Sequence, residues 1–242
     1  MPFVAIASLL VTQAPITLAY QPKVGSKYRF SINTLIKNSN AQRTLNAVSD
    51  IRIASYKNGY YQVETKLTNA KADGTNIPGK AQTTVLDYDK YGSVKVSTGG
   101  SSKAQQALSG LNNQALGMQF PKKAVKVGDT WSNSVDLGAM FTAMAKAPGT
   151  KASGKVNLSF KLTQVTAKSA TVSCSMKGSV DMNMPGRANS QVQVTMSLSG
   201  SGQYVIERAS GVHLSSTMKM DVITSSNGQR MSSTQTVSMK RV

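Results

Sequence analysis

The sequence is poor in the side chains that carry most metal and enzyme chemistry. It has one cysteine, Cys174, and one histidine, His213, in 242 residues. A single cysteine excludes an intramolecular disulfide bond. One cysteine and one histidine also fall short of the three or four ligands, usually His or Cys, of a zinc site. We therefore expect no metal site, no cofactor and a fold that holds together without disulfides.

Acidic residues are scarce as well, and none of them forms a recognisable catalytic pair. The ten carboxylates lie mostly in turns and at polar strand positions, and local spacing brings no two together as glycoside hydrolysis requires. No Gly-x-Ser-x-Gly motif accompanies His213, which alternation places on the solvent-facing side of its strand. Cys174 falls on an apolar side, where a free cysteine behaves as a small buried hydrophobe. We expect no catalytic residues and a protein that is not an enzyme.

Positive charge outweighs negative charge in the sequence as a whole. Lys and Arg number 28 against 10 Asp and Glu, which gives a net charge of +18. Such a field attracts nucleic acids, anionic lipids and acidic glycans. A nucleic-acid site would gather its cations on a helix or among aromatic residues, whereas here they are mostly scattered single residues, a pattern typical of a solvated face. We expect no specific nucleic-acid partner and keep an anionic envelope polymer as a candidate partner.

The amino terminus has the pattern of an export signal. Residues 3–11 form a short apolar run, and a polar stretch follows that ends at Ala19. The run is shorter than the roughly 20 apolar residues that a membrane-spanning helix needs. Only Met1 and Pro2 precede it, so the basic residues of a signal peptide are missing, and a start codon upstream would supply them. We predict a signal peptide over residues 1–19 and a periplasmic, cell-surface or extracellular protein.

Most of the remaining chain alternates between apolar and polar residues, as half-buried strands do. The amino-terminal half predicts strands near 26–37, 43–57, 60–70, 81–88 and 93–98. The carboxy-terminal half alternates even more strictly, for example in Val156, Leu158, Phe160 and Leu162. Turn pairs such as Asn58-Gly59 separate the runs. The pattern predicts a mainly β fold, with long antiparallel hairpins that form an open or half barrel.

Two segments near the middle of the chain have helical rather than strand patterns. The first covers 102–116 and the second 137–146. The apolar residues of the second would allow it to close one end of a barrel. We expect one or two short helices between two β halves.

The two halves begin with similar sequences. Residues 23–28, Lys-Val-Gly-Ser-Lys-Tyr, match residues 126–131, Lys-Val-Gly-Asp-Thr-Trp, and residues 88–94 pair more loosely with 206–212. Repetition of this kind indicates duplication of a structural unit. We predict an amino-terminal β half over 20–119, with its helix near 102–116, and a related carboxy-terminal β half over 120–242.

The segment from Phe120 to Trp131 contains Pro-x-x-x-Val-x-Val-Gly-Asp-x-Trp. It resembles the corresponding segment of a family of uncharacterised bacterial exported or envelope β proteins, a domain of unknown function. That resemblance implies a duplicated, exported β protein and offers no catalytic residue. In architecture alone, the predicted sheet also resembles the half-barrel carriers of the lipoprotein-localisation type, which bind acyl chains.

Methionine is the one residue type whose placement favours a function. Six methionines lie mostly on the apolar side of the carboxy-terminal strands: Met176, Met182, Met184, Met196, Met218 and Met220. Methionine is flexible and polarizable and adapts to irregular apolar guests, although a sheet must bury an apolar face with or without a ligand. We expect a non-enzymatic binding protein whose barrel cavity holds a lipid or another hydrophobic or amphipathic ligand, with these six residues as its lining. The alternative is a structural or adhesive envelope protein that binds anionic polymers through its basic surface.

Overall fold

The computed structural model describes residues 14–77, 83–95, 118–144, 150–185, 191–226 and 228–242. Its amino-terminal strands are β1 (Lys27–Asn38), β2 (Gln42–Lys57), β3 (Tyr60–Ala72), β4 (Thr75–Asn76), β5 (Thr83–Asp89) and β6 (Val94–Lys95). Its carboxy-terminal strands are β7 (Thr130–Asp136), β8 (Lys151–Ser153), β9 (Lys155–Val165), β10 (Ser169–Pro185), β11 (Gln191–Glu207), β12 (His213–Ser226) and β13 (Gln229–Arg241). The predicted mainly β, antiparallel fold is therefore confirmed.

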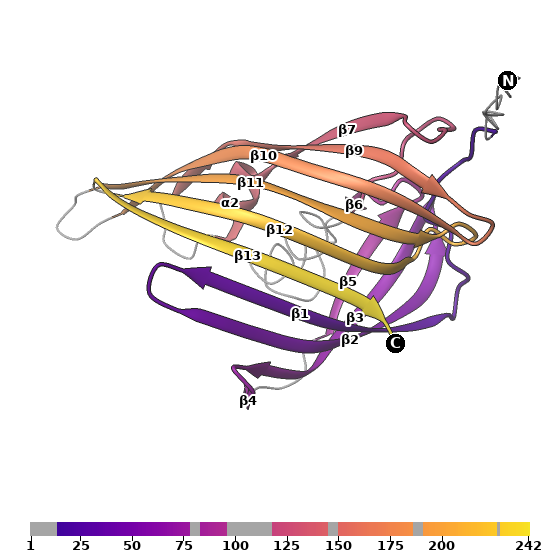
Figure 1. Ribbon diagram of the computed structural model, residues 1–242, viewed down its shortest axis with the longest axis horizontal. Coiled ribbons are helices and arrows are strands. Elements are labelled where there is room, and N and C mark those ends of the chain that lie inside the picture. The colour runs from indigo at the N-terminus through magenta and orange to yellow at the C-terminus, as the bar shows by residue number, and fades with distance from the viewer. Residues whose placement is uncertain (1–13, 78–82, 96–117, 145–149, 186–190, 227) are drawn as a thin grey trace, which may run out of the picture.

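All these strands belong to one sheet that curves into an open half barrel (Figure 1). Neighbouring strands follow the order β6-β5-β3-β2-β1-β13-β12-β11-β10-β9-β7, with β4 beside β3 and β8 beside β10. Within the described residues the end strands β6 and β7 do not pair with each other, so the barrel is not closed. The two halves meet in the middle, where β1 pairs with β13 over Phe30–Asn38 and Ser233–Arg241.

Two hairpins of the amino-terminal half show how local sequence sets the register. Asn58 and Gly59 join β2 to β3, and both have positive φ, 52° and 83°. Asp73 and Gly74 do the same between β3 and β4, with φ of 49° and 82°. Two-residue loops with both φ values positive match the right-handed twist of the strands, and Asn-Gly and Asp-Gly adopt them readily. The turn at Asn58-Gly59 is therefore confirmed, and Asp73-Gly74 follows the same rule.

The repeated Lys-Val-Gly segments adopt the same turn in each half. Gly25 has φ of +87° and donates its N–H to the Ile53 carbonyl at 2.8 Å; Gly128 has φ of +98° and donates to the Leu162 carbonyl at 2.8 Å. In return, Ile53 and Leu162 donate to the residues after the two glycines, Ser26 and Asp129, both at 3.0 Å. Each turn thus leads into the first long strand of its half, β1 or β7. The two Lys-Val-Gly segments thus match in hydrogen bonding as well as in sequence.

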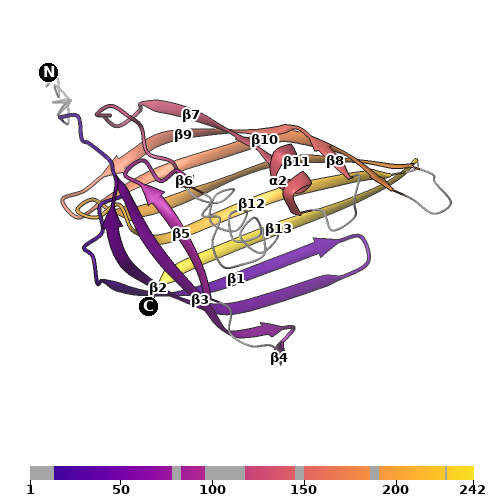
Figure 2. The ribbon, with the colours of Figure 1, turned by 180° about the vertical axis from the view of Figure 1, so that it is seen from behind.

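The hydrophobic core lies on the concave side of the sheet. In β9, Val156, Leu158, Phe160 and Leu162 are all almost fully buried, while the residues between them are exposed. The short helix α2 (Leu137–Met144) lies on the same side, as Figure 2 shows from behind, and its Leu137 belongs to this core. The helix corresponds to the predicted segment 137–146, and the predicted helix at 102–116 lies outside the described residues. No helix in the described ranges is long and apolar enough to cross a membrane.

A segment before the first strand also packs into this core. Ile16 and Val125 exchange backbone hydrogen bonds of 2.7 and 2.9 Å. Tyr20 donates its N–H to the Lys90 carbonyl at 2.8 Å, and the Leu18 side chain between them is only 2% exposed. Residues 16–20 therefore join parts of both halves. Cleavage after Ala19 stays a prediction, and such a cut would remove Leu18 from the core.

Candidate functional site: an apolar pocket on the concave face

The best candidate for a binding site is a pocket of about 120 Å³ on the concave face, at the end of the half barrel where β1 begins. Its floor comes from alternating inward residues of β1, namely Tyr28, Phe30 and Ile32. Strands β2 and β3 continue that floor with the cross-strand pair Ile51 and Thr65. Because the strands are antiparallel and in register, residues distant in sequence form one continuous apolar surface.

Met118 and Phe120, in the short segment before β7, line one side of the pocket. Trp131 fixes the residue between them, because its indole Nε1–H donates to the Gln119 carbonyl at 2.7 Å. The Asn133 side chain also donates to the Gln119 side chain. Met118 and Phe120 consequently turn toward the pocket, where both are buried. Trp131 itself stacks on Phe160, with ring centroids 5.6 Å apart, and so supports the pocket without lining it.

Tyrosines from separate segments meet at the edge of the pocket. The ring of Tyr20 lies 5.6 Å, centroid to centroid, from both Tyr61 and Tyr88. Burial raises the pKa of the Tyr20 hydroxyl far above its ordinary value, and the neighbouring tyrosines, Tyr88 first, raise it further. Burial alone raises the pKa of Tyr88. Both hydroxyls therefore remain protonated at physiological pH, as neutral hydrogen-bonding groups.

His213 faces this pocket, which corrects the sequence-based expectation that it points to solvent. The register between β11 and β12 shifts at this point, since Val205 pairs with Ser215 but Ile206 pairs with His213. The extra residue, Leu214, is a β-bulge that reverses the alternation, so His213 turns inward. There its ring lies 5.3 Å from the ring of Tyr204. Burial lowers the pKa of His213 from 6.5 to about 4, and the imidazole is neutral at pH 7.

Several polar side chains of the pocket have no partner within the described part of the chain. Ser49 is only 3% exposed, lines the pocket and forms no side-chain hydrogen bond with any described residue. The imidazole of His213 and the hydroxyls of Tyr20 and Tyr88 also line the pocket and form no hydrogen bond with a described residue, and these three residues are partly buried. Their polar atoms remain open to the pocket, because the one fully buried side-chain polar atom without a partner among the described residues is Thr150 Oγ1. The pocket thus presents hydrogen-bonding groups that a ligand could satisfy.

No charged side chain is among the described residues that line the pocket. The guanidinium of Arg241 lies over the ring of Tyr28, a lining residue, 5.9 Å from the ring centroid. Its Nη2 is paired with Glu207 at 3.1 Å, so its charge is already compensated. The site is apolar, with neutral polar groups.

The six methionines proposed as a ligand lining all lie on the concave side of the sheet, but none of them lines this pocket. Met176 and Met218 belong to the hydrophobic core, and Met182 and Met220 pack against it. Met184 and Met196 are half-buried further along β10 and β11. Two other methionines, Met118 and Met239, line the pocket instead. A ligand-contacting role for the six stays a prediction.

Glycines in β11 create the space that the two core methionines fill. A Cβ at Gly200 would lie 3.2 Å from the Met176 Cγ, and one at Gly202 would lie 3.0 Å from the Met218 Sδ. Since Met176 pairs with Gly200, and Gly202 with Met218, each long side chain lies over a strand position that has none. This packing accounts for the burial of the methionines without any ligand.

The structure offers no metal chemistry at the positions it describes. No cluster of three or more His, Cys, Asp or Glu side chains that could hold a metal ion is found there. Cys174 is buried in the core, as the alternation predicted, and burial raises the pKa of its thiol to about 12. The thiol therefore remains protonated and packs as an apolar group.

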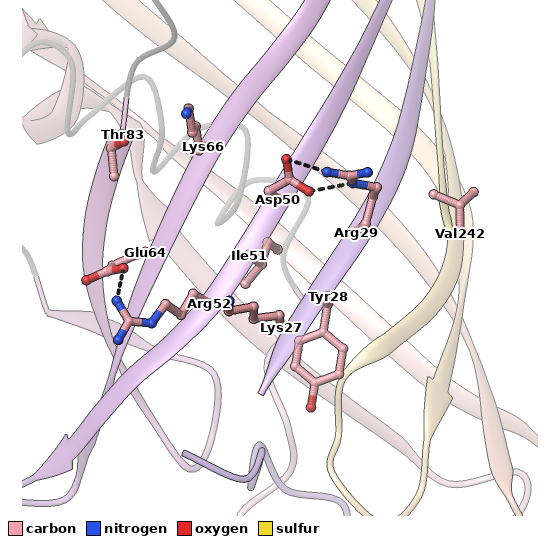
Figure 3. Close-up of a pocket in the computed structure, with 10 residues that line it drawn as sticks. All are labelled: Lys27, Tyr28, Arg29, Asp50, Ile51, Arg52, Glu64, Lys66, Thr83 and Val242. Atoms are coloured by element: carbon pink, nitrogen blue, oxygen red, sulfur yellow. Dashed lines mark hydrogen bonds and ion pairs between the residues drawn. The ribbon is translucent and has the colours of Figure 1, made fainter. Parts of the chain in front are cut away.

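A second, larger hollow of about 610 Å³ lies over β1, β2 and β3, lined mainly by residues that point away from the core (Figure 3). Four cations line it: Lys27, Arg29, Arg52 and Lys66. Two carboxylates compensate part of this charge, because Arg29 pairs with Asp50 at 2.6 Å and Arg52 pairs with Glu64 at 3.2 Å. The Arg29 guanidinium holds the pKa of the Asp50 carboxyl below its usual range. Lys27 and Lys66 form no ion pair in the described ranges.

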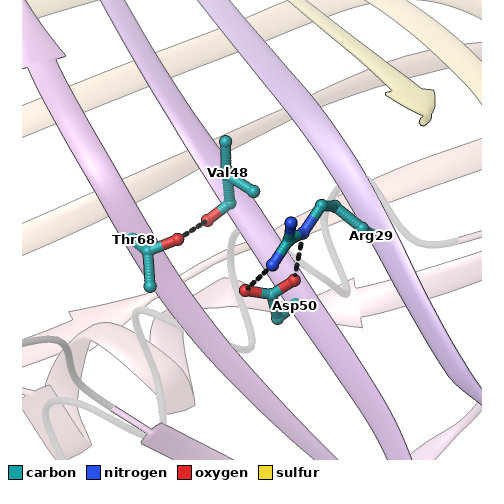
Figure 4. A network of polar contacts seen from close by, with 4 residues as sticks. All are labelled: Arg29, Val48, Asp50 and Thr68. Carbon is teal, nitrogen blue, oxygen red and sulfur yellow. Dashed lines mark hydrogen bonds and ion pairs between the residues drawn. The ribbon is translucent and has the colours of Figure 1, made fainter.

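The Arg29–Asp50 pair lies beside an irregularity in the sheet (Figure 4). The register between β2 and β3 shifts between Asn46 and Val48, and the Thr68 hydroxyl donates to the Val48 carbonyl at 3.5 Å. A bulge of this kind bends a strand and strengthens its twist. In Figure 1, β2 and β3 bend away from the direction of the carboxy-terminal strands, and the bulge lies in this part of the sheet.

An open antiparallel half barrel with an uncharged apolar pocket on its concave side defines the class of this protein. The model of a family of unknown function, DUF6263, matches residues 101–213. That stretch includes the Val-Gly-Asp-x-Trp segment and strands β7 to β11, and it covers just under half of the chain. The match agrees with the resemblance to an uncharacterised family. No curated protein matches the chain significantly.

Proposed function

We propose that this chain is a non-enzymatic, exported binding protein that holds a lipid or another hydrophobic or amphipathic ligand against the concave face of its half barrel. The observation that carries the proposal is the pocket itself, where aromatic and aliphatic side chains surround unpartnered neutral polar groups. Ligand pockets are commonly apolar with a few convergent polar groups. The scarcity of catalytic side chains favours binding over turnover.

The direct test is native mass spectrometry of the protein purified from its own cell envelope, followed by solvent extraction of whatever remains bound. We expect a stoichiometric hydrophobic molecule. An empty, monodisperse protein would count against the proposal. Purification from the envelope also tests export, because a protein recovered only from the cytoplasm would contradict that part of the proposal.

A matched pair of variants on β1 localises the binding. Ile32→Trp places a large ring in the pocket, and we expect it to abolish ligand retention. Leu35→Trp lies on the opposite face of the same strand and should leave retention unchanged. Both variants need a circular dichroism spectrum like that of the wild type. Equal ligand content in the two would show that the ligand binds elsewhere.

A second candidate function rests on the basic hollow over β1–β3. Four cations against two carboxylates, together with the net charge of +18, favour an anionic envelope polymer as a partner. Replacement of Lys27 and Lys66 by Glu reverses the two cations that form no ion pair and should weaken binding to polyphosphate at least tenfold. Lys219→Glu, on the exposed face of β12, is the control. Binding that is insensitive to salt would exclude this mode, since exposed charges are screened.

A further inference from the structure

The polar groups of the concave pocket indicate which part of a ligand it receives. Ser49 comes from β2, His213 from the bulged start of β12, Tyr88 from β5, and Tyr20 from the segment before β1. These four side chains come from segments far apart in sequence and all line a pocket of about 120 Å³. They include hydroxyl groups, which donate and accept hydrogen bonds, and a neutral imidazole, which does both through its two nitrogens.

A charged group would be poorly accommodated among them. A carboxylate, phosphate or ammonium that leaves water for an apolar site needs an opposite charge or several strong hydrogen bonds to offset its desolvation. The described lining offers no such charge, and the Arg241 guanidinium beside Tyr28 is already paired with Glu207. A neutral hydroxyl or carbonyl loses much less hydration and can pair with the free hydroxyls.

The size of the pocket limits what it can enclose. A cavity of about 150 Å³ holds a molecule as large as benzene, so about 120 Å³ holds a small head group or one ring, and not a whole lipid. The apolar remainder of a ligand would extend along the concave face. There, Ile36 of β1, Leu45 of β2 and Val237 of β13 are only partly buried.

We infer that the pocket selects an uncharged, oxygen-bearing head group, such as an alcohol, attached to an apolar body, and that it discriminates against charged amphiphiles. This inference rests on the proposed binding function and names its ligand class. The net charge of +18 would select the opposite class of ligand, because the positive field attracts anionic molecules to the protein surface. Head-group preference therefore separates selection in the pocket from attraction at the surface.

The test compares three probes with the same unsaturated 18-carbon chain: oleyl alcohol, oleate and oleylamine. Each displaces a neutral fluorescent dye such as Nile red from the full chain at pH 8, in 0.5 M NaCl, where surface charges are strongly screened. We expect oleyl alcohol to displace the dye at about one tenth of the concentration of either charged probe. Equal or tighter binding of oleate would overturn the inference while leaving the binding function intact. Failure of all three probes would overturn the binding function itself.

Serine variants identify the polar partner in the pocket. Ser49→Ala removes the buried hydroxyl of β2, and we expect the affinity for oleyl alcohol to fall about three- to tenfold, the range expected for loss of one hydrogen bond. Affinity for oleate should not change. Ser31→Ala, on an exposed position of β1, is the matched control. An unchanged preference in Ser49→Ala, with the fold intact, would show that Ser49 does not contact the head group.

Discussion

Leu18 provides a quantitative test of the segment that joins the two halves before the first strand. The side chain is 2% exposed within the core, and a buried Leu→Ala substitution costs about 2–5 kcal/mol because it removes packed methyl groups and leaves a cavity. With a urea dependence of roughly 3 kcal/mol per molar for a chain of this size, a loss of about 3 kcal/mol lowers the unfolding midpoint by roughly 1 M. Equilibrium urea unfolding followed by circular dichroism measures the shift.

The control for Leu18→Ala is Leu67→Ala, the same substitution at a β3 position that is 43% exposed. We expect the control to change the free energy of unfolding by no more than about 0.5 kcal/mol. Equal midpoints for the two variants would refute the packing of Leu18. The same assay applies to shortened chains, and a chain that begins at Tyr20 should unfold at a lower urea concentration than one that begins at Ala14. Amino-terminal sequencing of the protein purified from cells then shows whether they keep the segment.

Three further predictions concern the inner face of the sheet. Folding lowers the pKa of His213 from 6.5 to about 4, so as the pH falls the unfolded chain binds the proton before the folded chain does. Up to about 3 kcal/mol of stability, fully present above pH 6.5, is therefore lost as the pH drops toward 4. Urea midpoints measured across this pH range should show the loss in the wild type, and His213→Gln should remove it. Gly202→Val should lower the thermal midpoint by several degrees, because its Cβ would collide with the Thr217 carbonyl and with Met218, and an unchanged midpoint would contradict this close packing. Met196→Lys should reduce ligand retention in native mass spectra without unfolding the protein, whereas Met231→Lys, at a position that is 66% exposed, should do neither.

The strands could be predicted because one face of this sheet is buried and the other is solvated. Alternation marks such strands directly, and the Asn-Gly and Asp-Gly pairs mark the turns between them. The expected strand at 43–57 became β2 (Gln42–Lys57), and that at 60–70 became β3 (Tyr60–Ala72). Short strands such as β4 and β8 were missed, since two or three residues carry no periodic signal.

The pocket could not be predicted, because it depends on contacts between distant segments and on one local irregularity. Tyr20, Tyr61 and Tyr88 belong to three separate segments, and only the register of the sheet brings their rings together. His213 was placed on the wrong face because strict alternation takes no account of a bulge at Leu214. The methionines did mark the concave side, but Gly200 and Gly202 allow two of them to pack there as core.

The pairing of β1 with β13 has a consequence for how the chain acquires its structure. The first long strand of the sheet hydrogen-bonds to the last, so the middle of the half barrel connects residues about as far apart in sequence as the chain allows. Pairings between such distant residues form slowly, because the intervening chain must first be ordered. Until β13 is available, β1 can pair with β2 but keeps its other edge free. The centre of the finished sheet is thus among its last parts to form, and until then β1 presents an unpaired edge of backbone hydrogen-bonding groups.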